Sequence, residues 1–228
     1  MNTLQPKTKK RKTSQATFEY EKPWWDQNTW VIGVDEVGRG PLAGPVTVGG
    51  VCFPLMTESP ILTTIESLGI DDSKKLDHEK RAVLAQQIKT YTPYHAVAHT
   101  DVEYINQHGI VAALSSAVTQ VVRQICSLLS QDRPYILLID GYKLDQLPYE
   151  MQDKQYNIIK GDQLSISIAA ASIIAKVDRD QLMEDKSQEY PAYQWQQNKG
   201  YGTAIHLQAI REHGVSPYHR LQYVRKYL

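Results

Sequence analysis

Short apolar runs and longer amphipathic stretches follow one another along the chain, and their lengths and periods predict its secondary structure. Runs rich in Val and Ile that are bounded by Gly, Pro or an acid are typical of strands. They cover residues 30–35, 44–53, 94–100, 135–140 and 156–160. Apolar positions three and four residues apart predict helices over residues 77–89, 101–107, 110–129, 165–183 and 204–213. Residues 54–75 are expected to form a long loop.

The order of these elements predicts the fold class. Two strands come first, helices and strands then alternate, and helices follow at the end, which favours an α/β domain on a mixed sheet with a helical C-terminal extension. The run at residues 135–140 is apolar up to its final acid, as expected for a central strand buried on both faces. Trp24, Trp25 and Trp30 mark the expected start of order, as core anchors rather than base-stacking platforms. Residues 23–228 should therefore form one domain.

The charges are unevenly distributed although the formal net charge is zero. Residues 1–22 carry six Lys and Arg against two Glu and are otherwise polar, so we expect a disordered basic arm. A solubilising tail and a non-specific phosphate-binding arm fit this segment equally well. The remaining 206 residues have a slight acidic excess. If they bind nucleic acid, they must do so with local basic patches and with cations that carboxylates recruit.

Cysteine usage and hydropathy indicate the compartment. Cys52 and Cys126 are far apart and each lies in an apolar run, which predicts reduced, buried thiols rather than a disulfide. The sequence shows neither the apolar core of a signal peptide nor an apolar run of membrane-spanning length. We therefore expect a cytoplasmic protein that does not contact a membrane.

Acidic residues end two of the predicted strands. Asp35 and Glu36 close the first, and Asp140 closes the run at residues 135–140. A dry, unpaired carboxylate is costly, and a divalent cation such as Mg²⁺, which prefers oxygen ligands, would offset that cost. Taken alone, Asp140 would start a turn, Asp162 would cap a helix, and an Asp-Glu pair would be solvated. Because neighbours on a strand point to opposite faces, a shared site requires the strand to bend or end at Glu36.

Six short motifs in a fixed order resemble those of the ribonuclease HII family. They are residues 33–45 (GVDEVGRGPLAGP), 72–76 (DSKKL), 139–141 (IDG), 160–162 (KGD), 170–180 (AASIIAKVDRD) and 199–203 (KGYGT). The resemblance covers roughly residues 30–220, and Ala169 stands where the family usually has serine. It implies a ribonuclease H-like fold, in which helices flank a five-stranded mixed sheet and a helical C-terminal extension follows. Arg39 argues against the related ribonuclease HIII branch, whose turn lacks arginine.

The resemblance also implies a site. Its four acids carry over to Asp35, Glu36, Asp140 and Asp162, which would bind Mg²⁺ or Mn²⁺, with two ions when substrate is bound. Asp178 and Asp180 also lie in a matched segment, but their helix suggests ion pairing or packing. The residues that would contact substrate are Gly38, Arg39, Gly40, Tyr201, Ser73, Lys74 and Lys199.

Each substrate contact has a physical basis and a plainer alternative. Glycines let the backbone approach a sugar and read its 2′-hydroxyl, an arginine makes forked contacts with phosphate, and Tyr201 would stack on the deoxyribose after the ribonucleotide. Taken singly, the Gly-Arg-Gly segment would be a flexible turn, Tyr201 would be a packing residue, and exposed Ser and Lys would have no specific role.

The implied activity is hydrolysis of the RNA strand of RNA–DNA hybrids and of DNA on the 5′ side of an embedded ribonucleotide. It would leave a 3′-hydroxyl and a 5′-phosphate. Its biological role would be ribonucleotide removal from DNA. A non-catalytic hybrid-binding protein and a metal-dependent phosphatase or small-molecule hydrolase are the alternatives. The expected partner is nucleic acid. We expect a monomer without a clear protein partner, because residues 223–228 are short and basic and show no clamp-binding motif.

Overall fold

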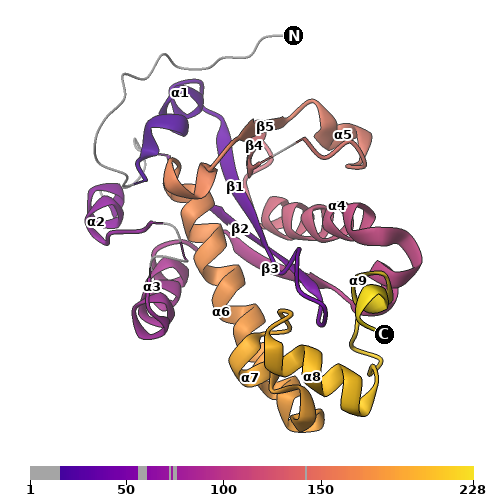
Figure 1. The fold of residues 1–228 in the computed structure, drawn as a ribbon. Helices are drawn as coiled ribbons and strands as arrows, with labels where there is room; N and C mark the ends of the chain where they lie inside the picture. Colours follow the sequence, from indigo (N-terminus) through magenta and orange to yellow (C-terminus); the bar gives the residue numbers. More distant parts are fainter. Residues whose placement is uncertain (1–15, 56–60, 72, 74–75, 142) are drawn as a thin grey trace.

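The computed structural model describes residues 16–55, 61–71, 73, 76–141 and 143–228. Its centre is a five-stranded mixed sheet in the order β3-β2-β1-β4-β5 (Figure 1). The strands are β1 (Trp30–Val37), β2 (Val46–Cys52), β3 (His95–Thr100), β4 (Tyr135–Asp140) and β5 (Gln155–Ile158). β1 pairs antiparallel with β2, which pairs antiparallel with β3, whereas β1, β4 and β5 are parallel neighbours. The predicted five-stranded mixed sheet is confirmed.

The register of the sheet brings two acidic strand ends together. Val34 of β1 pairs with Ile139 of β4 in the parallel ladder. The next residue on each strand is an acid. Asp35 and Asp140 therefore lie side by side near the carboxyl ends of these two strands. Carboxyl ends of adjacent parallel strands are where α/β folds commonly place their sites.

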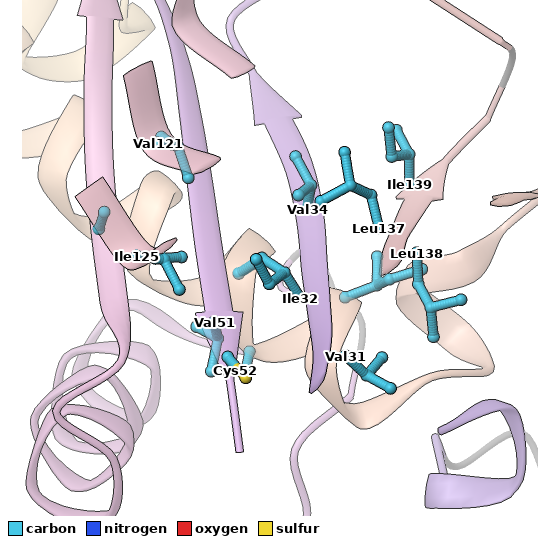
Figure 2. Close-up of a cluster of buried hydrophobic side chains, with 14 of the residues drawn as sticks. Val31, Ile32, Val34, Val51, Cys52, Val121, Ile125, Leu137, Leu138 and Ile139 are labelled. Carbon is cyan, nitrogen blue, oxygen red and sulfur yellow. The ribbon is translucent and has the colours of Figure 1, made fainter. Parts of the chain in front are cut away.

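Two long helices cover the two faces of the sheet, and glycines on the strands let them approach. α6 (Ile166–Glu189) lies on one face, where a Cβ on Gly33 would be 2.2 Å from the Ser167 carbonyl carbon. α4 (Val102–Leu128) lies on the other, where a Cβ on Gly50 would be 2.3 Å from Val121 Cγ1. Figure 2 shows Val121 and Ile125 of α4 pointing into the buried cluster that the strands form.

Smaller elements complete the layers. α3 (His78–Tyr91) packs beside α6. Two short helices, α1 (Lys22–Trp25) and α5 (Tyr149–Gln152), flank the sheet. The expected helical C-terminal extension is present as α7 (Trp195–Asn198), α8 (Ala204–His213) and α9 (Leu221–Val224), which gather near the end of α6 (Figure 1). The extension has its own apolar cluster around Trp195 and Met183.

One predicted loop is wrong, and one predicted division between helices is right. The expected loop at residues 54–75 contains α2 (Ile61–Ser67), whose Leu62 and Ile65 are buried. The two helices expected at 101–107 and 110–129 are confirmed as the two parts of α4, which divides at Gly109, where the backbone is not helical (φ 81°, ψ 167°). Undivided, α4 is long and apolar enough to cross a membrane by length and composition, although 44% of its most apolar window is buried within the protein. No other helix among the described residues passes that test.

The folded body begins earlier than predicted. Of the expected disordered arm at residues 1–22, residues 1–15 lie outside the described residues, but residues 16–22 belong to the fold. Phe18 is fully buried and meets Phe53 edge to face at 5.5 Å between ring centroids. The buried Glu21 carboxylate accepts hydrogen bonds from the Ser165 hydroxyl (2.6 Å) and the Ser167 amide (3.0 Å). These long-range contacts override the polar local composition.

Other predictions about the core hold. Trp25 and Trp30 are buried, and Trp24 packs on Tyr156 at 4.5 Å between ring centroids, as expected of core anchors. Cys52 and Cys126 are free thiols, as predicted, but only Cys52 is buried as expected, and Cys126 is partly exposed.

Candidate active site

Two of the four predicted acids accept hydrogen bonds from main-chain amides at one edge of the sheet, and a third lies beside them. Asp35 is 6% exposed, and its Oδ1 accepts a hydrogen bond from the Glu36 amide at 2.8 Å. Asp140 Oδ1 accepts one from the Gly161 amide at 2.6 Å. Gly161 opens the 3-10 turn Gly161–Gln163, which carries the buried Asp162 directly before α6. The structure therefore places Asp162 next to the strand ends that hold the other acids.

The pKa of Asp35 shows that the four acids share one electrostatic environment. Burial raises it well above the usual range, and the charges of Glu36, Asp140 and Asp162 raise it further, against a hydrogen bond from Ser172 that lowers it. Burial likewise raises the pKa of Glu36; Arg39 opposes that shift and Asp140 adds to it. Clustered buried carboxylates of this kind must bind protons or be neutralised by a cation.

The strand does not end at Glu36, because β1 continues to Val37. Asp35 therefore shares the α6 face with Gly33, where it meets Ser172, and Glu36 points to the opposite face. Being at the edge of the sheet, Glu36 still interacts with Asp140 and pairs with Arg39 at 3.6 Å between Oε1 and Nη1. The site therefore includes side chains from both faces of the sheet, at the carboxyl ends of β1 and β4.

The donor chemistry of this edge fits a hard divalent cation. Four carboxylates contribute only oxygen ligands, the type that Mg²⁺ and Mn²⁺ prefer. Main-chain amides fix one oxygen each of Asp35 and Asp140, and so fix the orientation of both carboxylates. As they stand, however, no three His, Cys, Asp or Glu side chains among the described residues form a ready-made metal cage. Binding an ion would require side-chain adjustment.

The predicted substrate loop lies beside these acids. Gly38 has φ 86° and is buried, whereas Gly40 is exposed and a Cβ built on it would meet no atom within 4 Å. The loop is tied to the C-terminal extension because the Leu42 amide donates to the Gly200 carbonyl at 2.8 Å. Tyr201 follows directly, with its side chain 45% exposed. The structure thus brings the glycine turn and Tyr201 together.

Two of the expected phosphate contacts are otherwise engaged. Ser73 is 2% exposed and its hydroxyl bonds to that of Ser172 at 2.9 Å, so it supports the residue that holds Asp35. The Lys199 ammonium pairs with Glu184 at 2.8 Å and is mostly buried. Lys74 lies outside the described residues. The side chains of Ser73 and Lys199 are therefore engaged within the protein. The structure does not present them to a substrate.

Asp178 and Asp180 form the ion pairs that their helix suggested. Asp178 pairs with His99 at 2.6 Å, and Asp180 with Lys176 at 2.6 Å and Arg81 at 3.8 Å.

Sequence reasoning missed two groups of residues behind the site. Arg179 and Arg220 are both 0% exposed and donate to main-chain carbonyls around the glycine turn. His206 and His219 are buried side by side, their Nε2 atoms 3.1 Å apart, and His206 Nδ1 lies 2.9 Å from the Tyr201 carbonyl oxygen. Arg179 lies in a motif that carries the resemblance, and His219 and Arg220 lie where the closing segment of the family would be, but nothing in the sequence indicated their burial.

Sequence comparisons with known proteins identify one family, and solved structures of that family and of RNase HIII share the fold. The family model described as Ribonuclease HII matches residues 32–226. A ribonuclease HII of Rickettsia canadensis is 42% identical over 209 residues, covering 89% of this chain and 93% of that protein. The PCNA:RNase HII complex from Archaeoglobus fulgidus has a similar fold (TM-score 0.67, 22% identity, 85% of this chain and 95% of that one). So has Bst-RNase HIII in complex with Mn²⁺ (TM-score 0.65, 24% identity, 82% and 63%).

Proposed function

This chain belongs to the ribonuclease HII family of ribonuclease H endonucleases, which act on RNA–DNA, and on that premise we propose that it cuts on the 5′ side of ribonucleotides embedded in duplex DNA. It also cuts the RNA strand of hybrids, and each cut leaves a 3′-hydroxyl and a 5′-phosphate. One observation carries the proposal: Asp35 shares its electrostatic environment with Glu36, Asp140 and Asp162 at the sheet edge, directly beside the glycine turn. Its biological role would be ribonucleotide removal from DNA.

The four acids are proposed as ligands of two divalent ions. Their oxygen donors and clustered charge fit Mg²⁺ or Mn²⁺, and the Mn²⁺ complex of a structural neighbour supports the choice. When bound, the ions lower the pKa of the attacking water and stabilise the leaving 3′-oxygen. Hydrogen bonds from main-chain amides hold the Asp35 and Asp140 carboxylates in place, and the Ser172 hydrogen bond favours the charged, ligating form of Asp35 because it lowers the pKa that burial raises.

The glycine turn and Tyr201 are proposed to select the substrate. Gly40 has open space around it, so the backbone can approach a ribose closely enough to sense its 2′-hydroxyl. Arg39 is half exposed beside Glu36 and can meet a phosphate next to the acids. The exposed ring of Tyr201 can stack on the adjacent deoxyribose. Ser73, Lys74 and Lys199 remain proposed phosphate contacts, the first through its backbone and the last only if its ion pair with Glu184 opens.

Replacement of Asp35 by Asn tests the assignment. Asp35→Asn should reduce Mg²⁺-dependent cleavage of an RNA–DNA hybrid by at least a thousand-fold, since the preorganised charge of a site supplies several kcal/mol. Asp178→Asn is the matched control, because it makes the same change on α6 outside the site. Near-normal cleavage by Asp35→Asn would contradict the metal site. A chain that binds hybrids without cutting them would be the non-catalytic binder, and one that hydrolyses only small phosphoesters would be the phosphatase.

The assembly and partners of the chain are also proposals. We propose a cytoplasmic monomer whose folded domain includes residues 16–228 and whose first 15 residues add non-specific affinity for phosphates. One structural neighbour is a complex with PCNA, so we also propose that this chain can bind a protein partner, against the expectation that it has none.

A further inference from the structure

Two buried arginines lie behind the glycine turn, and all of their contacts around it are to main-chain carbonyls. Arg220 donates from Nη2 to the Gly38 carbonyl (2.6 Å), from Nη1 to that of Arg39 (2.9 Å) and from Nε to that of Gly44 (2.9 Å). Its side chain is 0% exposed. A single guanidinium from the C-terminal extension thus binds three carbonyls of the loop that joins β1 to β2.

Arg179 of α6 binds the same loop. It donates from Nη2 to the Ala43 carbonyl (3.3 Å), from Nε to that of Pro45 (3.1 Å) and from Nη1 to that of Lys199 (3.0 Å). It too is 0% exposed, and a Cβ on Gly38 would be 2.1 Å from its Nε. The loop is therefore packed directly against both guanidinium groups.

Burying these two guanidinium groups carries an electrostatic cost. Neither forms an ion pair with a carboxylate in the part of the chain that the structure describes. Burial, and then the neighbouring charge of Arg179, lower the pKa of Arg220 to about 10. Two like charges buried together are unfavourable. The six carbonyl oxygens offset part of that cost, and the guanidinium groups in turn fix the orientation of these carbonyls.

The orientation of these carbonyls determines that of two amides. In a trans peptide the C=O and N–H groups point in opposite directions, and the described residues contain no cis bond. Because Arg220 draws the Gly38 and Arg39 carbonyls inward, the amides of Arg39 and Gly40 point away from the interior. Within the described residues neither amide donates a hydrogen bond to protein, and Gly40 borders an open hollow of about 770 Å³.

We propose that Arg220 is a positioning residue that aims the Arg39 and Gly40 amides at the sugar-phosphate backbone of the ribonucleotide, and that Arg179 supports it by holding the rest of the same loop and packing against Gly38. Two adjacent outward amides form an anion-binding concavity, and positive charge behind their carbonyls strengthens both as donors. The inference rests on the proposed function, since it names the groups that fix the ribose-reading loop. It also explains why the glycine turn is joined to the C-terminal extension, which supplies Arg220.

Arg220→Lys and Arg179→Lys test the inference, because lysine keeps the charge but loses the planar fork. The matched control is Arg211→Lys on the exposed side of α8. For each variant, KM is measured on a duplex with one ribonucleotide, and KI is measured for an all-DNA duplex as competitor. We expect the ratio of KM to KI to rise about tenfold in both test variants and to stay unchanged in the control. Partial unfolding would lower kcat and leave that ratio unchanged.

A ratio within twofold of the wild-type value in folded test variants would overturn the inference. If the variants fail to fold, hydrogen exchange of the wild-type chain tests the inference instead. The Arg39 and Gly40 amides should exchange fast in the free protein and slow more with the ribonucleotide duplex than with the all-DNA duplex. If both amides are already protected in the free protein, the inference is wrong. A wild-type chain that does not cut the ribonucleotide duplex would instead refute the proposed function, whatever the exchange result.

Discussion

The buried histidine pair behind Tyr201 should make the fold sensitive to acid. The Ser216 amide donates to His219 Nδ1 (2.9 Å), so that nitrogen carries no proton and His219 Nε2–H donates to His206 Nε2 (3.1 Å). The Trp195 indole N–H points at the same His206 nitrogen (3.1 Å), and His206 Nδ1–H donates to the Tyr201 carbonyl. The unprotonated nitrogen of each ring already accepts a hydrogen bond. A proton added there would be repelled by the N–H group that donates that bond.

The pKa of His219 gives the size of the effect. Burial, and then the neighbouring His206, lower it from 6.5 to about 4, and burial also lowers the pKa of His206. As pH falls below 6.5, His219 binds a proton in the unfolded chain but stays neutral in the folded chain until about pH 4. The free energy of unfolding therefore falls between pH 6.5 and about pH 4. One pKa unit corresponds to about 1.4 kcal/mol, so His219 alone should cost about 2 kcal/mol between pH 8 and pH 5.

Urea unfolding of His219→Gln at several pH values isolates this contribution. The free energy of unfolding should fall less steeply with acidification than in the wild type, by about 2 kcal/mol over the same interval. His213→Gln is the control, because His213 is exposed on α8 and its replacement should leave the pH dependence unchanged. Parallel curves for the wild type and His219→Gln would refute the reasoning, whatever their absolute stabilities, because other titrating groups contribute equally to both proteins.

Three further predictions concern the site and the arm. In EDTA, Asp35→Asn should raise the thermal unfolding midpoint, because it removes a buried charge that neighbouring acids repel. Mg²⁺ should raise the midpoint of the wild type only. A lower midpoint for Asp35→Asn in EDTA would contradict the pKa argument. Gly33→Ala should lower the free energy of unfolding by about 1–3 kcal/mol or more, because its Cβ would meet α6 backbone, whereas Gly40→Ala should leave stability unchanged but weaken ribonucleotide cleavage; equal stabilities would be evidence against the close approach of α6. Deleting residues 1–15 should reduce the salt dependence of DNA binding by about 0.9 in log–log slope for each phosphate that the arm neutralises, and an unchanged slope would show that the arm binds no phosphate.

Local pattern predicted the sheet and its acidic edge because both depend on short-range information. The strand that ends in Asp140 is a continuous apolar run, and the resemblance placed Asp162 beside it. The pattern could not show how Asp35 and Glu36 share a site on opposite faces. That outcome depends on where the strand ends relative to the edge of the sheet, which only the assembled register determines.

The features that the sequence did not predict depend on interactions between distant segments. Phe18 and Glu21 lie in a polar, basic stretch, and only the surfaces of β2 and α6 make their burial favourable. Arg179 stands between two acids in the sequence, but two of the carbonyls that it binds lie on a loop more than a hundred residues away, so its burial could not be predicted. Ser73 looked like a loop serine for the same reason. Side-chain burial of this kind is a property of the tertiary structure that local composition cannot give.

The most direct measurement is the position and chemistry of the cut in a DNA duplex that contains a single ribonucleotide. With Mg²⁺ and the wild-type chain, we predict one cut on the 5′ side of that ribonucleotide, with a 3′-hydroxyl and a 5′-phosphate at the new ends. The cut should disappear in EDTA and in the Asp140→Asn variant. Cleavage at other positions, cleavage that persists without divalent metal, or an intact duplex would contradict the account.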